Sequence, residues 1–107
     1  MPSDDRDIGR ALLVMHDLLR EINRETIHGI VPNMDAQRLK PFFTMVARAR
    51  ALYIKKLIEL PAGKSDLPTE AQVKELNLLR RSYDELIHGA QMIETAIERG
   101  YIDVGKV

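Results

Sequence analysis

The stretch PFFTMVARARALYIKKLIEL, residues 41–60, decides the fold that the sequence predicts. Its apolar residues recur at helical spacing and cover one side of a helix, while much of the other side is basic. Proline and glycine at Pro61, Gly63 and Pro68 predict a loop directly after it. We therefore expect this stretch to be the middle helix of three.

Helical periodicity continues on both sides of the middle helix, and the alternation typical of strands is absent. An apolar stripe precedes it, formed by Ile8, Ala11, Leu12, Met15, Leu18, Leu19 and Ile22. A coiled-coil-like seam follows it, formed by Leu76, Leu79, Tyr83, Leu86, Ala90, Ile93 and Ile97. The predicted helices cover residues of about 4–27, 35–60 and 69–99, and are followed by a tail at 100–107.

Local signals predict where the outer helices begin and end. Ser3 is the expected N-cap of the first helix, and Gly29 is its expected stop. Thr69 followed by Gln72 matches the capping box at the start of the third helix. Gly100 is the expected stop of the third helix, and the apolar residues after it indicate a tail that packs or pairs.

The start of the middle helix is complicated by Pro41. A proline there removes the helical hydrogen bond to the carbonyl of Gln37. We expect Asn33 or Asp35 to cap a short turn over residues 35–40, and a kink at Pro41 to separate this turn from the main helix.

Size and composition favour one all-α domain over residues 1–107. The 107 residues suffice for a single domain, and 45% apolar with 30% charged residues is a globular balance. The chain has no cysteine, which excludes disulfides and thiolate sites. The polar start MPSDDRD is unlike a secretory signal, and no apolar run reaches the roughly 20 residues of a membrane span. We expect a cytoplasmic protein without a membrane partner.

The predicted architecture is an antiparallel three-helix bundle with a long third helix. At 1.5 Å per residue the third helix would extend about 15 Å beyond the middle one. Either the 35–40 segment covers this overhang, or a second chain completes the bundle as a dimer.

Zero net charge hides an uneven distribution along the chain. Residues 1–33 hold four basic and six acidic residues, residues 34–60 hold six and two, and residues 61–107 hold six and eight. The basic middle helix is explained by complementarity with its acidic neighbours, or it forms a strip that binds nucleic acid weakly. Nucleic acid is the less favoured partner, because aromatic interleaving and excess positive charge are missing.

Two Glu-x-x-His motifs, Glu25 with His28 and Glu85 with His88, place a carboxylate and an imidazole one turn apart. The pair resembles half of the ligand set of di-iron carboxylate bundles, over ten residues of the chain. Against a metal site, the middle helix supplies only Glu59, and Glu85 and His88 fall outside the seam. We expect no cofactor, and a di-metal site is the alternative.

Arg50 lies in the middle of the apolar side of the middle helix, so its guanidinium needs a partner. One hypothesis is a buried or interfacial ion pair with Glu21, Glu25, Asp84 or Glu85. The other is an anion clamp, in which Arg50 and Arg48 hold a carboxylate or phosphate.

No nucleophile motif, phosphate-binding loop or catalytic triad is present in the sequence. The predicted function is a non-catalytic helical module for protein–protein interaction or regulation, with a protein partner or a second copy of the chain. The alternative is a metal-binding or small-anion-binding bundle that uses the paired motifs or Arg50. A third candidate is weak nucleic-acid binding through the basic middle helix.

Overall fold

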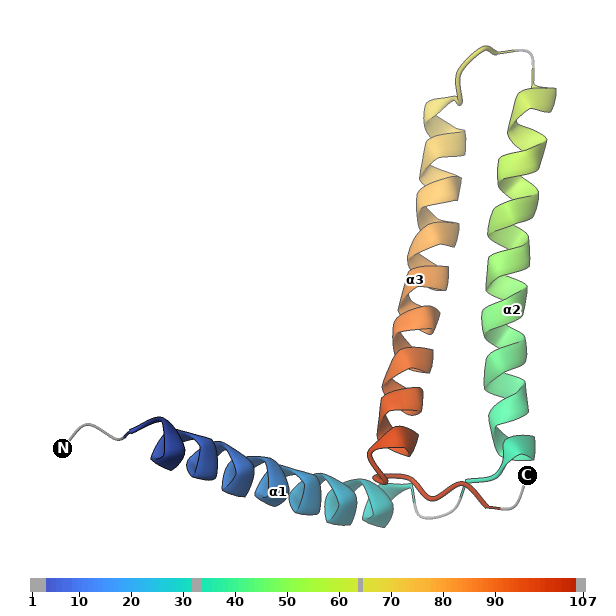
Figure 1. Ribbon diagram of the computed structural model, residues 1–107. Helices are drawn as coiled ribbons and strands as arrows, with labels where there is room; N and C mark the ends of the chain where they lie inside the picture. Colours follow the sequence, from blue (N-terminus) through green and yellow to red (C-terminus); the bar gives the residue numbers. More distant parts are fainter. Residues whose placement is uncertain (1–3, 32–33, 64, 106–107) are drawn as a thin grey trace. The chain divides into compact units, whose positions relative to one another are not determined.

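The computed structural model describes residues 4–31, 34–63 and 65–105, and this part of the chain is all-α (Figure 1). Its elements, in order, are α1 (Asp5–Ile30), α2 (Ala36–Glu59), the 3-10 helix η1 (Leu60–Ala62) and α3 (Glu70–Glu98). These residues form no strand beyond one isolated parallel bridge, between Met34 and Val104. No helix within these ranges is long and apolar enough to cross a membrane.

The chain divides into two compact units. The terminal unit consists of Met1–Ala36 together with Glu94–Val107, and the hairpin unit consists of Gln37–Ile93. The terminal unit therefore contains α1, the last residues of α3 and the C-terminal tail. The hairpin unit contains α2, η1 and most of α3.

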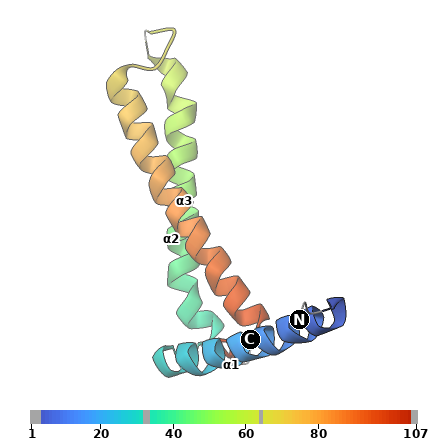
Figure 2. The ribbon, with the colours of Figure 1, turned by 90° about the vertical axis from the view of Figure 1, so that its left-hand side faces the viewer.

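In the hairpin unit, α2 and α3 lie side by side and run in opposite directions (Figures 1 and 2). The residues of α2 and η1 that lose exposure recur every three or four positions: Leu39, Phe42, Val46, Ala49, Tyr53, Lys56 and Leu60. The predicted seam of α3 is partly buried at all seven positions, as sequence periodicity indicated. The most enclosed apolar residues of the hairpin unit are Leu39 and Val46, at 8% and 7% exposure.

A helix is present over nearly the predicted range of 35–60, and its first residues belong to this helix and not to a separate turn before Pro41. Residues from Ala36 onward already belong to α2. Proline removes one backbone donor in the second turn, and the helix that continues through it buries Leu39 at 8% exposure.

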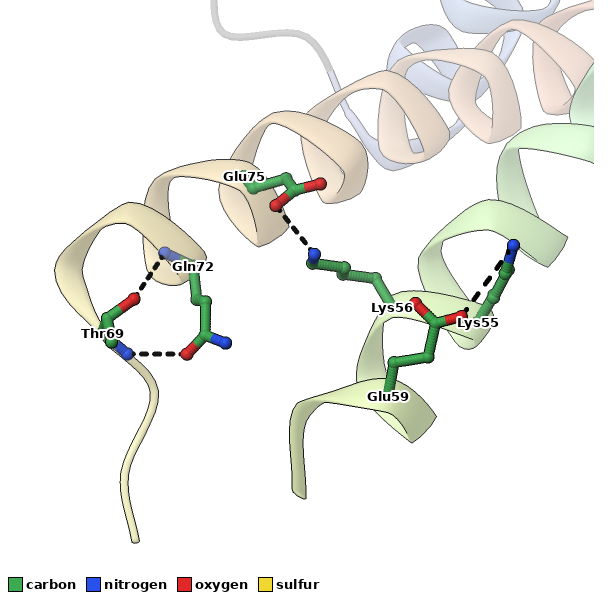
Figure 3. Close-up of polar contacts among 6 residues, drawn as sticks. All are labelled: Lys55, Lys56, Glu59, Thr69, Gln72 and Glu75. Atoms are coloured by element: carbon green, nitrogen blue, oxygen red, sulfur yellow. Dashed lines mark hydrogen bonds and ion pairs between the residues drawn. The ribbon is translucent and has the colours of Figure 1, made fainter. Parts of the chain in front are cut away.

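The helix ends agree with the local signals in part. Thr69 and Gln72 form the predicted capping box: the Thr69 amide donates to the Gln72 side chain at 2.8 Å, and the Gln72 amide donates to the Thr69 hydroxyl at 3.2 Å (Figure 3). The predicted caps Ser3 and Asn33 lie outside the described residues. The N-cap of α1 is Asp4, whose carboxylate accepts from the amide of Asp7.

The predicted stop of α1 at Gly29 is wrong, because α1 continues to Ile30. The amide of Val31 still donates to the carbonyl of Ile27, at 2.7 Å, and Gly29 does not adopt a positive φ. A glycine ends a helix only when it takes the left-handed conformation, and here it remains an ordinary helical residue.

Gly100 ends α3 as predicted, with φ of 74°. Its amide donates to the carbonyl of Ile97, and the amide of Tyr101 donates to the carbonyl of Ala96, which is the Schellman pattern. This turn directs the tail back onto the terminal unit, where Tyr101 and Ile102 are buried at 9% and 8% exposure. The expectation that the tail packs is confirmed.

The two glycines provide a matched test of this difference. Gly100→Ala forces a side chain into the left-handed region and is expected to lower the free energy of unfolding by about 1–2 kcal/mol. Gly29→Ala meets no atom within 4 Å and is expected to be neutral or to stabilise by up to about 1 kcal/mol. Urea unfolding followed by circular dichroism measures both. Equal effects would contradict the left-handed cap at Gly100.

Candidate functional site

The apolar stripe predicted on α1 forms a helix in the structure but remains exposed. None of the 26 residues of α1 is buried. The six large residues of the stripe are each between 45% and 53% exposed: Ile8, Leu12, Met15, Leu18, Leu19 and Ile22. An amphipathic helix normally buries its apolar face, so this stripe is the first candidate interaction surface.

A second exposed stripe runs along α2 in the hairpin unit. Its members are spaced four and three residues apart: Phe43, Ala47, Arg50, Ile54 and Leu57. Phe43, Ile54 and Leu57 are 43%, 46% and 41% exposed. This stripe, called here the α2 outer stripe, lies beside the seam that packs on α3. Two adjacent apolar stripes on one helix are typical of a helix with two packing partners.

Arg50 lies at the centre of the α2 outer stripe and contacts Tyr83 of α3. Its Nε and a terminal guanidinium nitrogen donate to the Tyr83 hydroxyl at 2.9 and 2.7 Å. The guanidinium carbon is 5.4 Å from the centre of the Tyr83 ring, a cation–π distance. None of the ion pairs within the described residues involves Arg50, and the candidate partners Asp84 and Glu85 do not bind it there. Within the described residues, Arg50 is therefore held by the hydroxyl and the ring of Tyr83 and not by a carboxylate.

Arg48 does not share this environment. Two residues along a helix are about 200° apart, so Arg48 and Arg50 leave α2 on different sides. Arg48 instead lines an open hollow of about 500 Å³ with Lys40, Pro41 and Met45 among others. The anion clamp predicted for Arg48 and Arg50 stays a prediction. The described hollow that Arg48 lines does not include Arg50.

Several cations of α2 are paired within the hairpin unit. Lys56 Nζ lies 2.9 Å from a carboxylate oxygen of Glu75, and Lys55 Nζ lies 3.8 Å from one of Glu59 (Figure 3). The Lys56–Glu75 contact joins α2 to α3 and agrees with the interpretation that the basic helix complements acidic neighbours, whereas Lys55 and Glu59 both belong to α2. Exposed pairs of this kind contribute about 0–1 kcal/mol each. They therefore favour one register of the two helices more than they stabilise the folded state.

The two Glu-x-x-His motifs belong to different units. Glu25 and His28 lie in the terminal unit, and Glu85 and His88 lie in the hairpin unit. Within the described ranges, no group of three or more histidine or acidic side chains is arranged to hold a metal ion. The Nε2 atom of His28 lies 3.5 Å from a carboxylate oxygen of Asp103, a tail residue that the motif did not include.

The terminal unit contains an open hollow of about 600 Å³ that sequence reasoning missed. From α1 it is lined by His16, Leu19, Arg20 and Asn23, and from the end of α3 and the tail by Glu98, Arg99 and Tyr101. The Nδ2 group of Asn23 donates to the Tyr101 hydroxyl at 3.3 Å. This hydrogen bond, and then the nearby guanidinium of Arg99, lower the pKa of Tyr101, and the positive charge of Arg20 acts in the same direction.

The only sequence signal for this hollow was the apolar tail after Gly100, which indicated that the tail would pack or pair. Its arginines come from opposite ends of the chain, and no local motif connects them. Helical spacing along one element cannot reveal a site assembled by a tail that docks on another.

Comparison with known proteins does not assign a function to these surfaces. No protein-family model matches the chain, and neither a curated protein nor a solved structure matches it.

Proposed function

We propose that the protein is a non-catalytic helical interaction module, and that its working surface is the apolar stripe of α1. The observation that carries the proposal is the exposure of all six large residues of this stripe. Monomeric proteins rarely expose contiguous apolar patches larger than a few hundred Å². Six large side chains on one helical face, each about half exposed, form a patch of that class.

The partner in this proposal is a second copy of the same chain. The α1 stripe of one copy packs against the α2 outer stripe of the other, and each hairpin with its added helix forms an antiparallel three-helix bundle. The terminal unit by itself leaves the α1 stripe exposed, and the hairpin unit by itself leaves the α2 outer stripe exposed, so each unit offers an apolar surface for the other type of unit. The proposed interface therefore needs only two copies of this chain and no other protein.

Charge complementarity supports this pairing. On a helical wheel, Asp7, Glu21 and Glu25 follow one edge of the α1 stripe. On α2, Arg50 lies inside the outer stripe and Lys40 lies at its edge. The acidic edge of one surface would face the basic side of the other, and this selects the partner and the register.

The energies are of the size that a stable dimer requires. Completing the burial of a half-exposed leucine, isoleucine or methionine contributes about 1 kcal/mol. Two copies of the interface bury the six large α1 residues twice, together with Phe43, Ile54 and Leu57 of each partner. This sum exceeds the lower estimates of about 4 kcal/mol for lost translational and rotational freedom.

The mass in solution tests the proposal directly. Size-exclusion chromatography with light scattering is expected to give the mass of two 12.2 kDa chains at micromolar concentration. The midpoint temperature of thermal unfolding is expected to rise with protein concentration, because only folded chains associate. A single-chain mass at every concentration, with a constant midpoint, would contradict a second copy as the partner.

A further inference from the structure

The hollow of the terminal unit gathers positive charge without a matching acid. Arg20 and Arg99 both line it, and neither takes part in an ion pair within the described residues. Among the described residues of the lining, Glu98 is the only acidic one, against two guanidinium groups and His16. The formal charge of the lining is therefore positive even when His16 is neutral.

A hydrogen bond within this hollow reaches the hydroxyl oxygen of Tyr101. Asn23 donates to it at 3.3 Å, and Tyr101 is itself buried at 9% exposure. The pKa of Tyr101 is lowered, first by the hydrogen bond from Asn23 and then by Arg99. Groups that stabilise negative charge on a phenol oxygen also stabilise an oxyanion placed beside it.

We infer that this hollow is a binding site for a small oxyanion, a carboxylate or phosphate group held between Arg20 and Arg99. A planar guanidinium offers paired donors that match both groups, and two such forks can grip one anion from α1 and from the tail. Asn23 fixes the Tyr101 hydroxyl so that its proton can point to the anion.

The remaining lining residues define the class of ligand. A hollow of about 600 Å³ lies within the range of small-molecule sites. Leu19 supplies an apolar wall for a hydrocarbon part, and Glu98 disfavours a second negative group on its side. The favoured ligand is thus a small molecule with one anionic group and an apolar remainder.

The site differs from the anion clamp predicted on α2. It lies wholly within the terminal unit, whereas Arg48 and Arg50 belong to the hairpin unit. It requires no residue of a second copy of the chain, and Leu19 is the one residue that its described lining shares with the α1 stripe.

The test uses the full-length chain with two probes, potassium phosphate and potassium benzoate, each compared with potassium chloride at equal ionic strength. Either probe is expected to raise the thermal unfolding midpoint above the chloride control. A gain with phosphate alone assigns a phosphate site, and a gain with benzoate alone assigns a carboxylate site. No gain with either probe would overturn the inference.

Variants localise the effect. Arg20→Gln and Arg99→Gln are each expected to weaken binding about tenfold or more, as measured by calorimetric titration. Arg24→Gln is the matched control, because Arg24 lies one turn along α1 and does not line the hollow. If Arg99→Gln disturbs folding, Arg99→Lys keeps the charge and loses the fork, and an intermediate affinity is expected. Equal affinity in all variants would contradict this site.

Tyr101 supplies an independent readout. A bound anion offsets the charge of the two arginines, so it is expected to raise the pKa of Tyr101 toward its usual value. Titration of tyrosinate absorbance, with and without the probe, measures this shift, and Tyr101→Phe identifies which of the three tyrosines moves. An unchanged titration with a saturating probe would contradict binding beside Tyr101.

Discussion

Replacing Leu12 and Leu19 together by glutamate is expected to convert the dimer into single chains. The two residues are one heptad apart on the α1 stripe, and they are 45% and 48% exposed within the chain. The double variant loses the apolar burial of two leucines and places two carboxylates without partners in an apolar interface. We expect the dissociation constant to rise at least 1,000-fold, roughly 4 kcal/mol, as measured by analytical ultracentrifugation.

Leu13→Glu is the matched control for this prediction. Leu13 is 65% exposed and lies next to Leu12 in sequence, but on a helical wheel it falls on the other side of α1 from the stripe. The same chemical change there is expected to leave the mass of the protein unchanged. Loss of the dimer in Leu13→Glu, or its survival in the double variant, would contradict the α1 stripe as the interface.

The second large effect is expected from Leu39→Ala in the hairpin unit. Leu39 is 8% exposed and begins the α2 seam that packs on α3. Removing three carbon atoms loses their burial and leaves a cavity, so the free energy of unfolding is expected to fall by about 2–5 kcal/mol. Urea unfolding at fixed protein concentration measures the change.

Leu52→Ala provides the comparison on the same helix. Leu52 is 49% exposed and lies off the seam, so the same substitution is expected to cost at most about 1 kcal/mol. Similar losses for Leu39→Ala and Leu52→Ala would mean that the seam is not the core of the hairpin. A change confined to Leu39→Ala supports the seam.

The existence of the helices could be predicted because their signals are local. The spacing of apolar residues alone predicts the seam from Leu76 to Ile97, and all seven of its positions are partly buried. The capping box of Thr69 and Gln72 forms as its pattern indicated, since both partners lie within one turn. Gly100 likewise ends α3 through bonds to residues only a few positions away.

The failures concern a glycine and a proline that do not interrupt their helices. Gly29 was expected to end α1, yet the helix continues because nothing requires a left-handed residue there. The turn predicted before Pro41 is absorbed into α2, since the neighbouring Leu39 is among the most buried residues of the described chain. Intrinsic preferences of about 1–3 kcal/mol are readily outweighed by a buried side chain and its helix.

The partners of charged side chains could not be predicted from the sequence. Acidic residues were the expected partners of Arg50, and the structure places the neutral phenol of Tyr83 there instead. Arginine pairs with any well-placed acceptor, and which acceptor is near depends on the register between two helices. The register between two helices depends on how they pack together, so the sequence of one helix does not determine it.

By itself, the sequence determined the helices, the α3 seam, the apolar stripe of α1 and the uneven charge along the chain. These follow from the spacing and chemistry of neighbouring residues. The tertiary structure alone decided that Arg50 binds Tyr83, that the tail buries Tyr101 and Ile102, and that Arg20 and Arg99 line one hollow. Such contacts join residues remote in sequence, and only the packing that brings their backbones together selects them.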